Sequence, residues 1–409
     1  MGPPANSQAQ PHAALGVERA LGCHLLLMAC SVLMAIMQLD TQCTRHAALG
    51  CKLRRCRRQS FIKLTGTKRR LSMKAIRTYT LLVATVPLIV SMNITASEKT
   101  IPVTAENFSH AETARNYRNW AKQGANEVFV KMPGLPPRGK AAATVQMNDD
   151  TLYGSAIVEA VDGDVTFSIP ETDNYLAVQV VTERGHGQHY VVEDGQYSLP
   201  VESQYAFLIY RSGTENGIAF AKASLDKVDV TDFNFATSYQ VQPYDYDEVE
   251  KWVKQYTQEV NSMDNFTYTF PRTSKDVTDL HQWNLENAAG WGGASPEAFV
   301  GNKYANSPKM KADTCYTSTF DDPENKFFTS ITAYDNDKYL MEDVRNINSH
   351  TWDKNSDGTI TVSFNCGELA KNNIDTQGND FTFTSRHYGV NPKVMSSAED
   401  PIISSVEAQ

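Results

Sequence analysis

Short runs of alternating residues, separated by turn-forming residues, constrain the fold of this chain more than any other feature. Between residues 152 and 212 the sequence contains five such runs, LYGSAIVEA, VTFSIPE, YLAVQVVTE, HYVVED and YAFLIYRS. Turn-forming segments such as Asp-Gly, Glu-Thr-Asp-Asn and Asp-Gly-Gln separate several of them. Successive side chains of a strand point to opposite faces of a sheet, so this pattern predicts short strands of a β-sandwich or jelly roll.

The strand pattern returns near the C-terminus in the runs FFTSITAYDND, GTITVSF and FTFTSRHYGV. Between the two groups of runs, residues 245–263 and 275–290 have the apolar spacing of helices. A further helix is predicted over residues 104–123, with Thr104 as its cap. The predicted fold class is therefore mainly β, with two jelly-roll-like β-sandwich domains joined by a helical connector.

A segment with the layout of a secretory signal peptide lies at residues 73–96. Met73 is followed by the basic residues Lys74 and Arg77, by an apolar run, and by a predicted cleavage site at Ala96. Such a segment belongs at the start of a chain, so Met73 is expected to be the true start. The alternative is a genuine basic presequence in which residues 21–39 form a membrane anchor.

Changes in composition and pattern divide the chain into five expected parts. The first two are a non-native upstream extension and the signal peptide, and the mature body holds two β-sandwiches on either side of the connector. Their predicted bounds are 1–72 for the extension, 73–96 for the signal peptide, 97–240 for an N-terminal helix with the first sandwich, 241–290 for the connector and 291–409 for the second sandwich.

The charge of the chain is divided unevenly. The formal net charge is −9, but residues 97–409 carry 25 basic and 45 acidic residues. This acidic body argues against nucleic acid and anionic lipid as partners, since both carry negative charge themselves. Together with the signal peptide, it predicts a periplasmic or secreted protein, with no membrane insertion of the mature chain.

Cysteine usage agrees with an exported protein. Of the seven cysteines, only Cys315 and Cys366 lie in the predicted mature body. Exported proteins reach an oxidising compartment, so these two cysteines are expected to form one disulfide.

Two polar stretches are candidates for chemistry. Asp149 and Asp150 directly precede a predicted strand. Paired carboxylates can hold a metal, act as a general acid and a general base, or form a turn. The loop TERGHGQHYVV places Glu183, His186 and His189 between two strands, where they could bind zinc or supply a base. The spacing matches no strict metal motif, so a polar surface loop is the favoured interpretation and no metal site is assigned.

Aromatic residues supply a possible binding wall. Trp291 is flanked by glycines and could stack on a ligand or fill a domain interface, and Tyr334 and Tyr339 lie at the end of a predicted strand. Residues 97–409 contain no G-x-S-x-G, H-E-x-x-H, Walker or C-x-x-C motif. Serine hydrolase, zinc protease and nucleotide-binding functions therefore lack their usual sequence support.

Several blocks together resemble a known bacterial family. ENFSHAETARNY, MNDDTLYGSA, VTFSIPETDNYLAVQVV, AAGWGG, ITAYDNDKYL and DGTITVSF follow one another over residues 101–393. In this order and spacing they are similar to exported proteins built from the domains of unknown function 1254 and 1214. The resemblance implies two jelly-roll-like β-sandwiches with helices between them, and it implies no established reaction.

The resemblance also ranks the candidate residues. Asp149 falls on a variable position of the family's entry motif, so Asp150 is the acid that the resemblance selects. This chain keeps the family's Glu and His as Glu183 and His189 but carries an insertion, which leaves open whether His186 or His189 takes the family's place. The other residues that match family positions or lie in these blocks are Asn148, Tyr153, Trp291, Tyr334, Tyr339 and Asn346.

Two hypotheses of different classes follow. The favoured one is a ligand-binding or assembly protein, with a small molecule or glycan as candidate ligand and a homo-oligomer as an open alternative. The other is a hydrolase or lyase acting on a small ester or glycan, in which Asp150, Glu183 and His189 converge for acid and base work. The sequence identifies no cofactor for either hypothesis.

Overall fold

The structure is a computed structural model that describes residues 100–142, 145–260, 266, 268–290 and 294–409. All of these residues belong to one compact unit of the chain. The expected upstream extension and signal peptide lie outside the described residues, as does Trp291.

The first half of the unit is built on a five-stranded antiparallel sheet in the order β1-β2-β7-β4-β5. Strand β7 lies at its centre and is buried over its whole length, which explains why its run is nearly continuous in apolar residues. A separate antiparallel pair joins β3 to β6. The strands of this half are β1 (Val130–Lys131), β2 (Thr151–Glu159), β3 (Asp164–Ile169), β4 (Leu176–Thr182), β5 (Gly187–Val191), β6 (Gly195–Pro200) and β7 (Tyr205–Gly213).

The two faces of the five-stranded sheet bury different partners. On one face, Val158 and Leu208 pack with Phe167 of the β3–β6 pair and with Leu225 of α3 (Ile218–Asp226). On the other face, side chains such as Phe207 pack against α2 (Phe108–Ala121), and the rings of Tyr117 and Phe207 lie 5.5 Å apart. Alternation along each strand thus supplies two separate cores.

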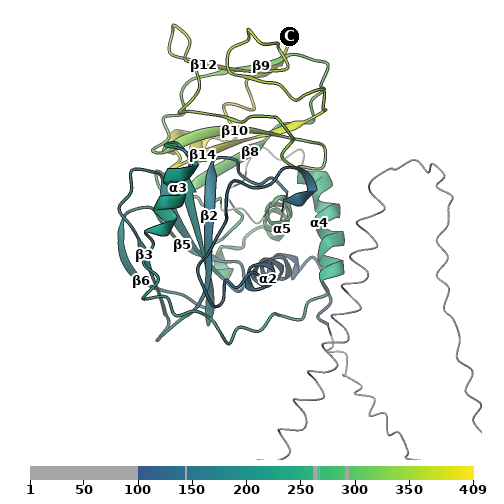
Figure 1. Cartoon of the computed structure of the whole chain (residues 1–409). Coiled ribbons are helices and arrows are strands. Elements are labelled where there is room, and N and C mark those ends of the chain that lie inside the picture. The colour runs from purple at the N-terminus through teal and green to yellow at the C-terminus, as the bar shows by residue number, and fades with distance from the viewer. Residues whose placement is uncertain (1–99, 143–144, 261–265, 267, 291–293) are drawn as a thin grey trace, which may run out of the picture. The chain divides into compact units, whose positions relative to one another are not determined.

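Three helices form a layer beside this sheet and below the C-terminal sheets (Figure 1). They are α2, α4 (Tyr246–Val260) and α5 (Leu280–Ala289), and their shared core contains Phe108, Val249 and Leu285. Helix α2 begins four residues after the predicted cap. The backbone N–H of Thr104 donates to the Asn107 side chain instead, so the chain turns once before the helix starts.

The second half of the unit is a β-sandwich of two four-stranded sheets, β11-β10-β14-β8 and β13-β12-β9-β15. Its core stacks Phe364 of β12 on Phe383 of β14, with ring centroids 4.6 Å apart. Every pairing is antiparallel except that of β12 with β13. The strands are β8 (Asn302–Asn306), β9 (Tyr316–Phe320), β10 (Phe328–Tyr334), β11 (Ile347–Asn348), β12 (Ile360–Phe364), β13 (Asn373–Ile374), β14 (Thr382–Tyr388) and β15 (Val406–Ala408).

The prediction of a mainly β fold with β-sandwich organisation is confirmed by these sheets. The predicted disulfide is also confirmed: Cys315 and Cys366 are joined beside strands β9 and β12. Three short helices complete the described elements, η1 (Gly139–Ala141), η2 (Ser274–Asp276) and α6 (Pro392–Ser396).

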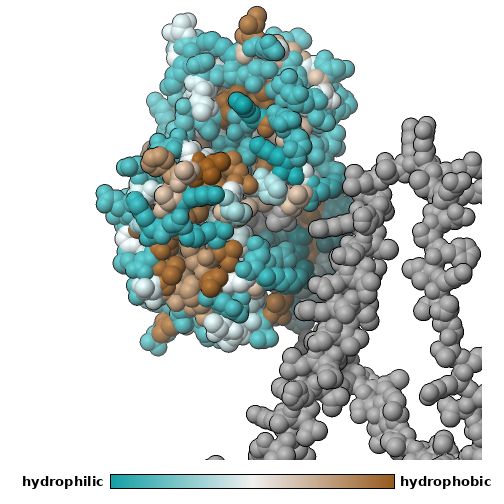
Figure 2. Space-filling view, in the orientation of Figure 1, coloured by the Kyte–Doolittle hydropathy of each residue, from teal (hydrophilic) through white to brown (hydrophobic). Residues whose placement is uncertain are grey.

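The surface is mainly hydrophilic on the face drawn in Figure 2, with hydrophobic side chains gathered around α3. Ile218 and Phe220 of this helix are 42% and 58% exposed. Within the part of the chain that the structure describes, no helix combines the length and the apolar character needed to cross a bilayer.

Candidate functional site

A cavity of about 140 Å³ lies where the N-terminal sheet, the helical layer and the C-terminal sandwich meet. Side chains from α2, β2, β7, α5, β8 and β14 line it, together with residues 145–148. An engineered cavity of about 150 Å³ binds benzene, so this space is of the size of a single ring.

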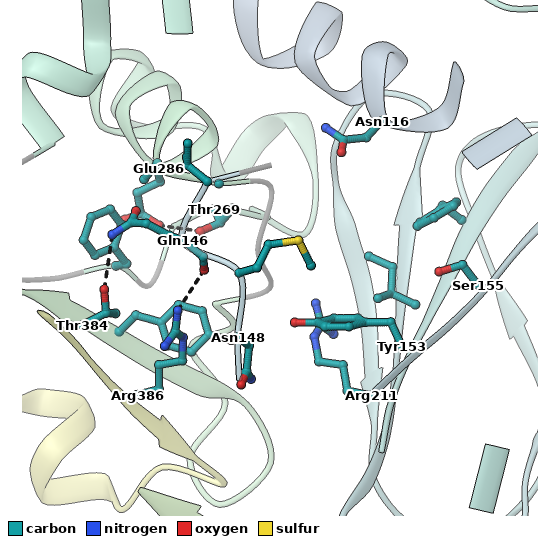
Figure 3. Close-up of a pocket in the computed structure, with 18 of the residues that line it drawn as sticks. Asn116, Gln146, Asn148, Tyr153, Ser155, Arg211, Thr269, Glu286, Thr384 and Arg386 are labelled. Atoms are coloured by element: carbon teal, nitrogen blue, oxygen red, sulfur yellow. Dashed lines mark hydrogen bonds between the residues drawn. The ribbon is translucent and has the colours of Figure 1, made fainter. Parts of the chain in front are cut away.

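The segment that carries residues 146–148 runs between the two β halves (Figure 3). Gln146 adopts a left-handed backbone conformation, with φ of 52°, which is uncommon for a residue with a Cβ. Hydrogen bonds on all sides hold it there. Its N–H donates to the Lys338 carbonyl at 2.8 Å, and its side-chain amide donates to Asn306 Oδ1 at 2.8 Å and to Thr384 Oγ1 at 3.2 Å.

The C-terminal wall of the cavity is dominated by Arg386 of β14, which is only 3% exposed. Its guanidinium donates to Thr332 Oγ1 at 3.1 Å, to the Gln146 carbonyl at 2.9 Å and to the Tyr334 hydroxyl. Burial raises the pKa of Tyr334 to about 12 although Arg386 lowers it, so this hydroxyl stays neutral at physiological pH. Arg386 therefore places a buried positive charge beside a neutral hydroxyl.

The opposite wall comes from the five-stranded sheet. Tyr153 of β2 and Arg211 of β7 are directly paired across the two strands, and the Arg211 guanidinium carbon lies 5.9 Å from the centre of the Tyr153 ring. Figure 3 shows these two side chains and Ser155 on the side of the cavity facing Arg386. Arg211 is 2% exposed and Ser155 is fully buried.

The remaining lining mixes apolar side chains with one acid. Trp120 of α2 and Phe207 and Ile209 of β7 supply apolar surface. Glu286 of α5 accepts hydrogen bonds from the Tyr268 N–H, the Thr269 hydroxyl and the Gln282 amide. The lining therefore offers both an apolar part and buried charges, as small-molecule sites usually do.

Asp149 and Asp150 lie next to this site but do not line the cavity. Asp150 is buried, and its Oδ1 accepts hydrogen bonds from the Asn346 amide at 2.6 Å and the Asn348 amide at 3.1 Å. Asp149 Oδ2 accepts from Arg138 at 2.9 Å. The two adjacent carboxylates thus have separate partners, and Asp150 joins the first β half to the second.

Asp149 is expected to make stability depend on pH. Burial raises its pKa to about 6 against the opposing effect of Arg138, so the folded protein binds this proton more tightly than the unfolded chain. Stability is therefore expected to fall as pH rises from about 4 to about 6, by up to roughly 3 kcal/mol from this group. Chemical unfolding across this range should give a flatter pH profile for Asp149→Asn, and equal slopes for the variant and the wild type would contradict the assignment.

The predicted trio of Asp150, Glu183 and His189 does not converge. Residue 151 pairs with Gly213 at one end of β7, whereas residue 182 pairs with Ala206 at the other end. At about 3.3 Å per residue, residues 151 and 182 are roughly 23 Å apart along the sheet, and Asp150 and Glu183 adjoin them at these opposite ends. An acid and base mechanism that needs all three residues at one atom is not compatible with this register.

The histidine loop forms a cluster of its own. The Nδ1 atom of His186 is hydrogen-bonded to Glu202, and the ring lies 6.0 Å from that of Trp283. His189 Nε2 is hydrogen-bonded to the Pro200 carbonyl at 2.7 Å. In the described ranges, no group of three or more His, Cys, Asp or Glu side chains is arranged to hold a metal.

The other candidates from the sequence have mixed positions. Asn148 and Tyr153 line the cavity, and Tyr334 contacts it through Arg386. Asn346 binds Asp150, while Tyr339 is half-buried and its N–H donates to Asp335.

Sequence reasoning missed both arginines, Ser155 and Asn306. A signal for the arginines exists, because Arg211 and Arg386 each interrupt a strand run, YAFLIYRS and FTFTSRHYGV, whose other residues are mostly apolar or small. A charged residue inside a buried strand requires partners, so such a position is a functional candidate.

The comparisons with known proteins concern the fold. Residues 127–258 match the model of DUF1254, a family described as a protein of unknown function. This DUF1254 match covers the five-stranded sheet and most of α4, and it includes Asn148, Asp150, Tyr153 and Glu183. The expected 1214 domain lies outside the matched residues and stays a prediction. None of the curated proteins matches the chain.

Two solved structures are similar to about three quarters of the chain. The VPA0106 protein from Vibrio parahaemolyticus has a TM-score of 0.54 and 15% identity, with 75% of this chain and 97% of that chain covered. An uncharacterized protein from Burkholderia cenocepacia has a TM-score of 0.42 and 13% identity, with 74% and 86% covered. At these identities the similarity to VPA0106 concerns the fold alone.

Proposed function

We propose that this chain is an exported protein that binds a small organic molecule in the cavity between its two β halves. The observation that carries the proposal is a pair of buried polar atoms at the cavity, Ser155 Oγ and Asn306 Nδ2, that have no hydrogen-bond partner among the described residues. A buried polar group without a partner costs about 1–3 kcal/mol. A ligand that supplies the missing partners recovers this energy.

The construction of the walls supports the proposal. Ser155 and Arg211 lie on the central strands of one sheet, and Asn306 and Arg386 lie on neighbouring strands of another. All four side chains are buried, so they lose little further freedom when a ligand binds, which favours affinity. The strained backbone of Gln146 beside them fits the general rule that such conformations cluster at functional sites.

Export is part of the same proposal and rests on other features. The layout of residues 73–96 is that of a signal peptide, and the disulfide between Cys315 and Cys366 suits an oxidising compartment. The hydrolase alternative is not carried forward, because its three residues do not share a site.

A cavity-filling variant tests the proposal. In a thermal-shift screen of ring-sized compounds, a ligand at 100 times its Kd should stabilise the wild type by about 2.7 kcal/mol, a shift of several degrees. We expect Ser155→Leu to weaken such ligands by at least about tenfold, because the added carbons occupy the cavity. The matched control is Ser198→Leu on β6, an exposed position that should bind as the wild type does. Absence of any hit, or equal binding by Ser155→Leu, would refute the proposal.

A further inference from the structure

We infer that the ligand of this cavity is a small organic monoanion, a carboxylate on a ring-sized apolar body, held by the buried arginines. This inference rests on the proposed function and adds the chemical class of the ligand to it. Within the lining, Arg386 carries the charge and Trp120, Phe207 and Ile209 carry the apolar contact.

Arg386 is the first line of support. No ion pair of the described residues includes it, and its hydrogen bonds there go to neutral oxygens of Thr332, Gln146 and Tyr334. A guanidinium has five N–H donors in a planar fork that fits a carboxylate. A buried guanidinium whose direct hydrogen bonds go to neutral oxygens is therefore suited to an anion brought in by a ligand.

The charged side chains in and beside the cavity indicate the charge of the ligand. Arg211 and Arg386 are the two cations of the lining, and Glu286 is its acid. The neighbouring acids Asp149 and Asp150 do not line the cavity, and both lie within electrostatic range of Arg386. Asp149 is also paired with Arg138, and Asp150 accepts hydrogen bonds from two amides. The lining thus holds one more cation than it holds acids, which suits a singly charged ligand better than a dianion such as phosphate.

The apolar side of the cavity indicates the size and apolar character of the ligand's body. Phe207 and Ile209 project from the same face of β7, and Trp120 of α2 packs on Phe207 with ring centroids 5.9 Å apart. Together with a volume of about 140 Å³, this surface suits a single ring rather than a sugar chain or a peptide. The unpartnered Ser155 Oγ and Asn306 Nδ2 supply further polar contacts at the cavity.

Three probes of matched size or charge test the inference on the full-length protein as purified. They are benzoate, its neutral analogue benzamide, and inorganic phosphate, with Kd measured by calorimetry at low salt. We expect benzoate to bind at least about tenfold more tightly than benzamide, because hydrogen bonds to a charged group are the stronger ones. Phosphate should bind more weakly than benzoate.

Variants locate the binding. Arg386→Lys keeps the charge but loses the planar fork, so it should weaken benzoate about tenfold and change benzamide by less than about twofold. Arg386→Gln removes the charge, and near-ultraviolet circular dichroism reports whether it still folds. The probe comparison on the wild type does not depend on either variant. Ser155→Leu should abolish the binding of both ring compounds.

The outcomes separate the two proposals. If benzamide binds as tightly as benzoate, or phosphate binds more tightly, the anion inference is overturned while a binding function stands. If no ring compound binds, charged or neutral, the binding function and the monoanion inference are both overturned. Benzoate binding that is unchanged in Arg386→Lys and Ser155→Leu would place the anion elsewhere and overturn the inference.

Discussion

Replacing Asp150 with alanine is expected to lower the free energy of unfolding by about 4 kcal/mol. The Asp150 carboxylate accepts from the amides of Asn346 and Asn348, which are 196 and 198 residues away in sequence. Alanine leaves both half-buried amides without this acceptor, and an unpaired buried group costs about 1–3 kcal/mol. The loss should weaken the contact between the two β halves rather than one strand.

Chemical unfolding checks this prediction, with two comparison variants. Asp150→Asn retains an oxygen that can accept from one amide, so it should lose roughly half as much stability. Asp337→Ala is the surface control, since Asp337 pairs with Lys140 at 3.3 Å while both side chains are largely exposed. It should change stability by no more than about 0.5 kcal/mol. An Asp150→Ala protein within about 1 kcal/mol of the wild type would contradict the linking role.

Removal of the disulfide is the second change with a large expected effect. The bond between Cys315 and Cys366 closes a loop with a sequence separation of 51 residues. In the chain-entropy model a loop of this length stabilises the folded state by about 4 kcal/mol, because it restricts the unfolded chain. The double variant Cys315→Ala with Cys366→Ala is expected to lose that amount.

Chemical unfolding with and without a reducing agent measures the stability that the disulfide contributes. Reduction should bring the wild type down to the stability of the double variant, and the double variant itself should not respond to reduction. A double variant as stable as the oxidised wild type would show that the loop is already restricted in the unfolded chain, and the entropic account would fail.

Much of the fold could be predicted from local patterns. The run YAFLIYRS became β7 and the run GTITVSF became β12, because alternation and turn residues act within a few positions of each other. Helix α2 was predicted four residues too long at its start, since the Asn107 side chain binds the Thr104 N–H and holds a turn there.

The candidate site was predicted less well. Asn148 and Tyr153 are among the predicted residues and line the cavity, but the trio of Asp150, Glu183 and His189 rests on residue type and on the family resemblance. Residue type indicates what chemistry a side chain can do, whereas convergence depends on strand register. Here the register places two of the three at opposite ends of β7.

The sequence by itself determined the mainly β architecture, the pairing of Cys315 with Cys366, and the apolar and polar alternation of the strands. Each of these depends on spacing along the chain or, for the disulfide, on there being only two cysteines in the predicted mature body. The tertiary structure alone decided that Arg211 and Arg386 line one cavity and that Asp150 binds Asn346 across the two halves. Such contacts depend on how sheets pack and on which strands pair, and no local pattern of residues specifies either of them.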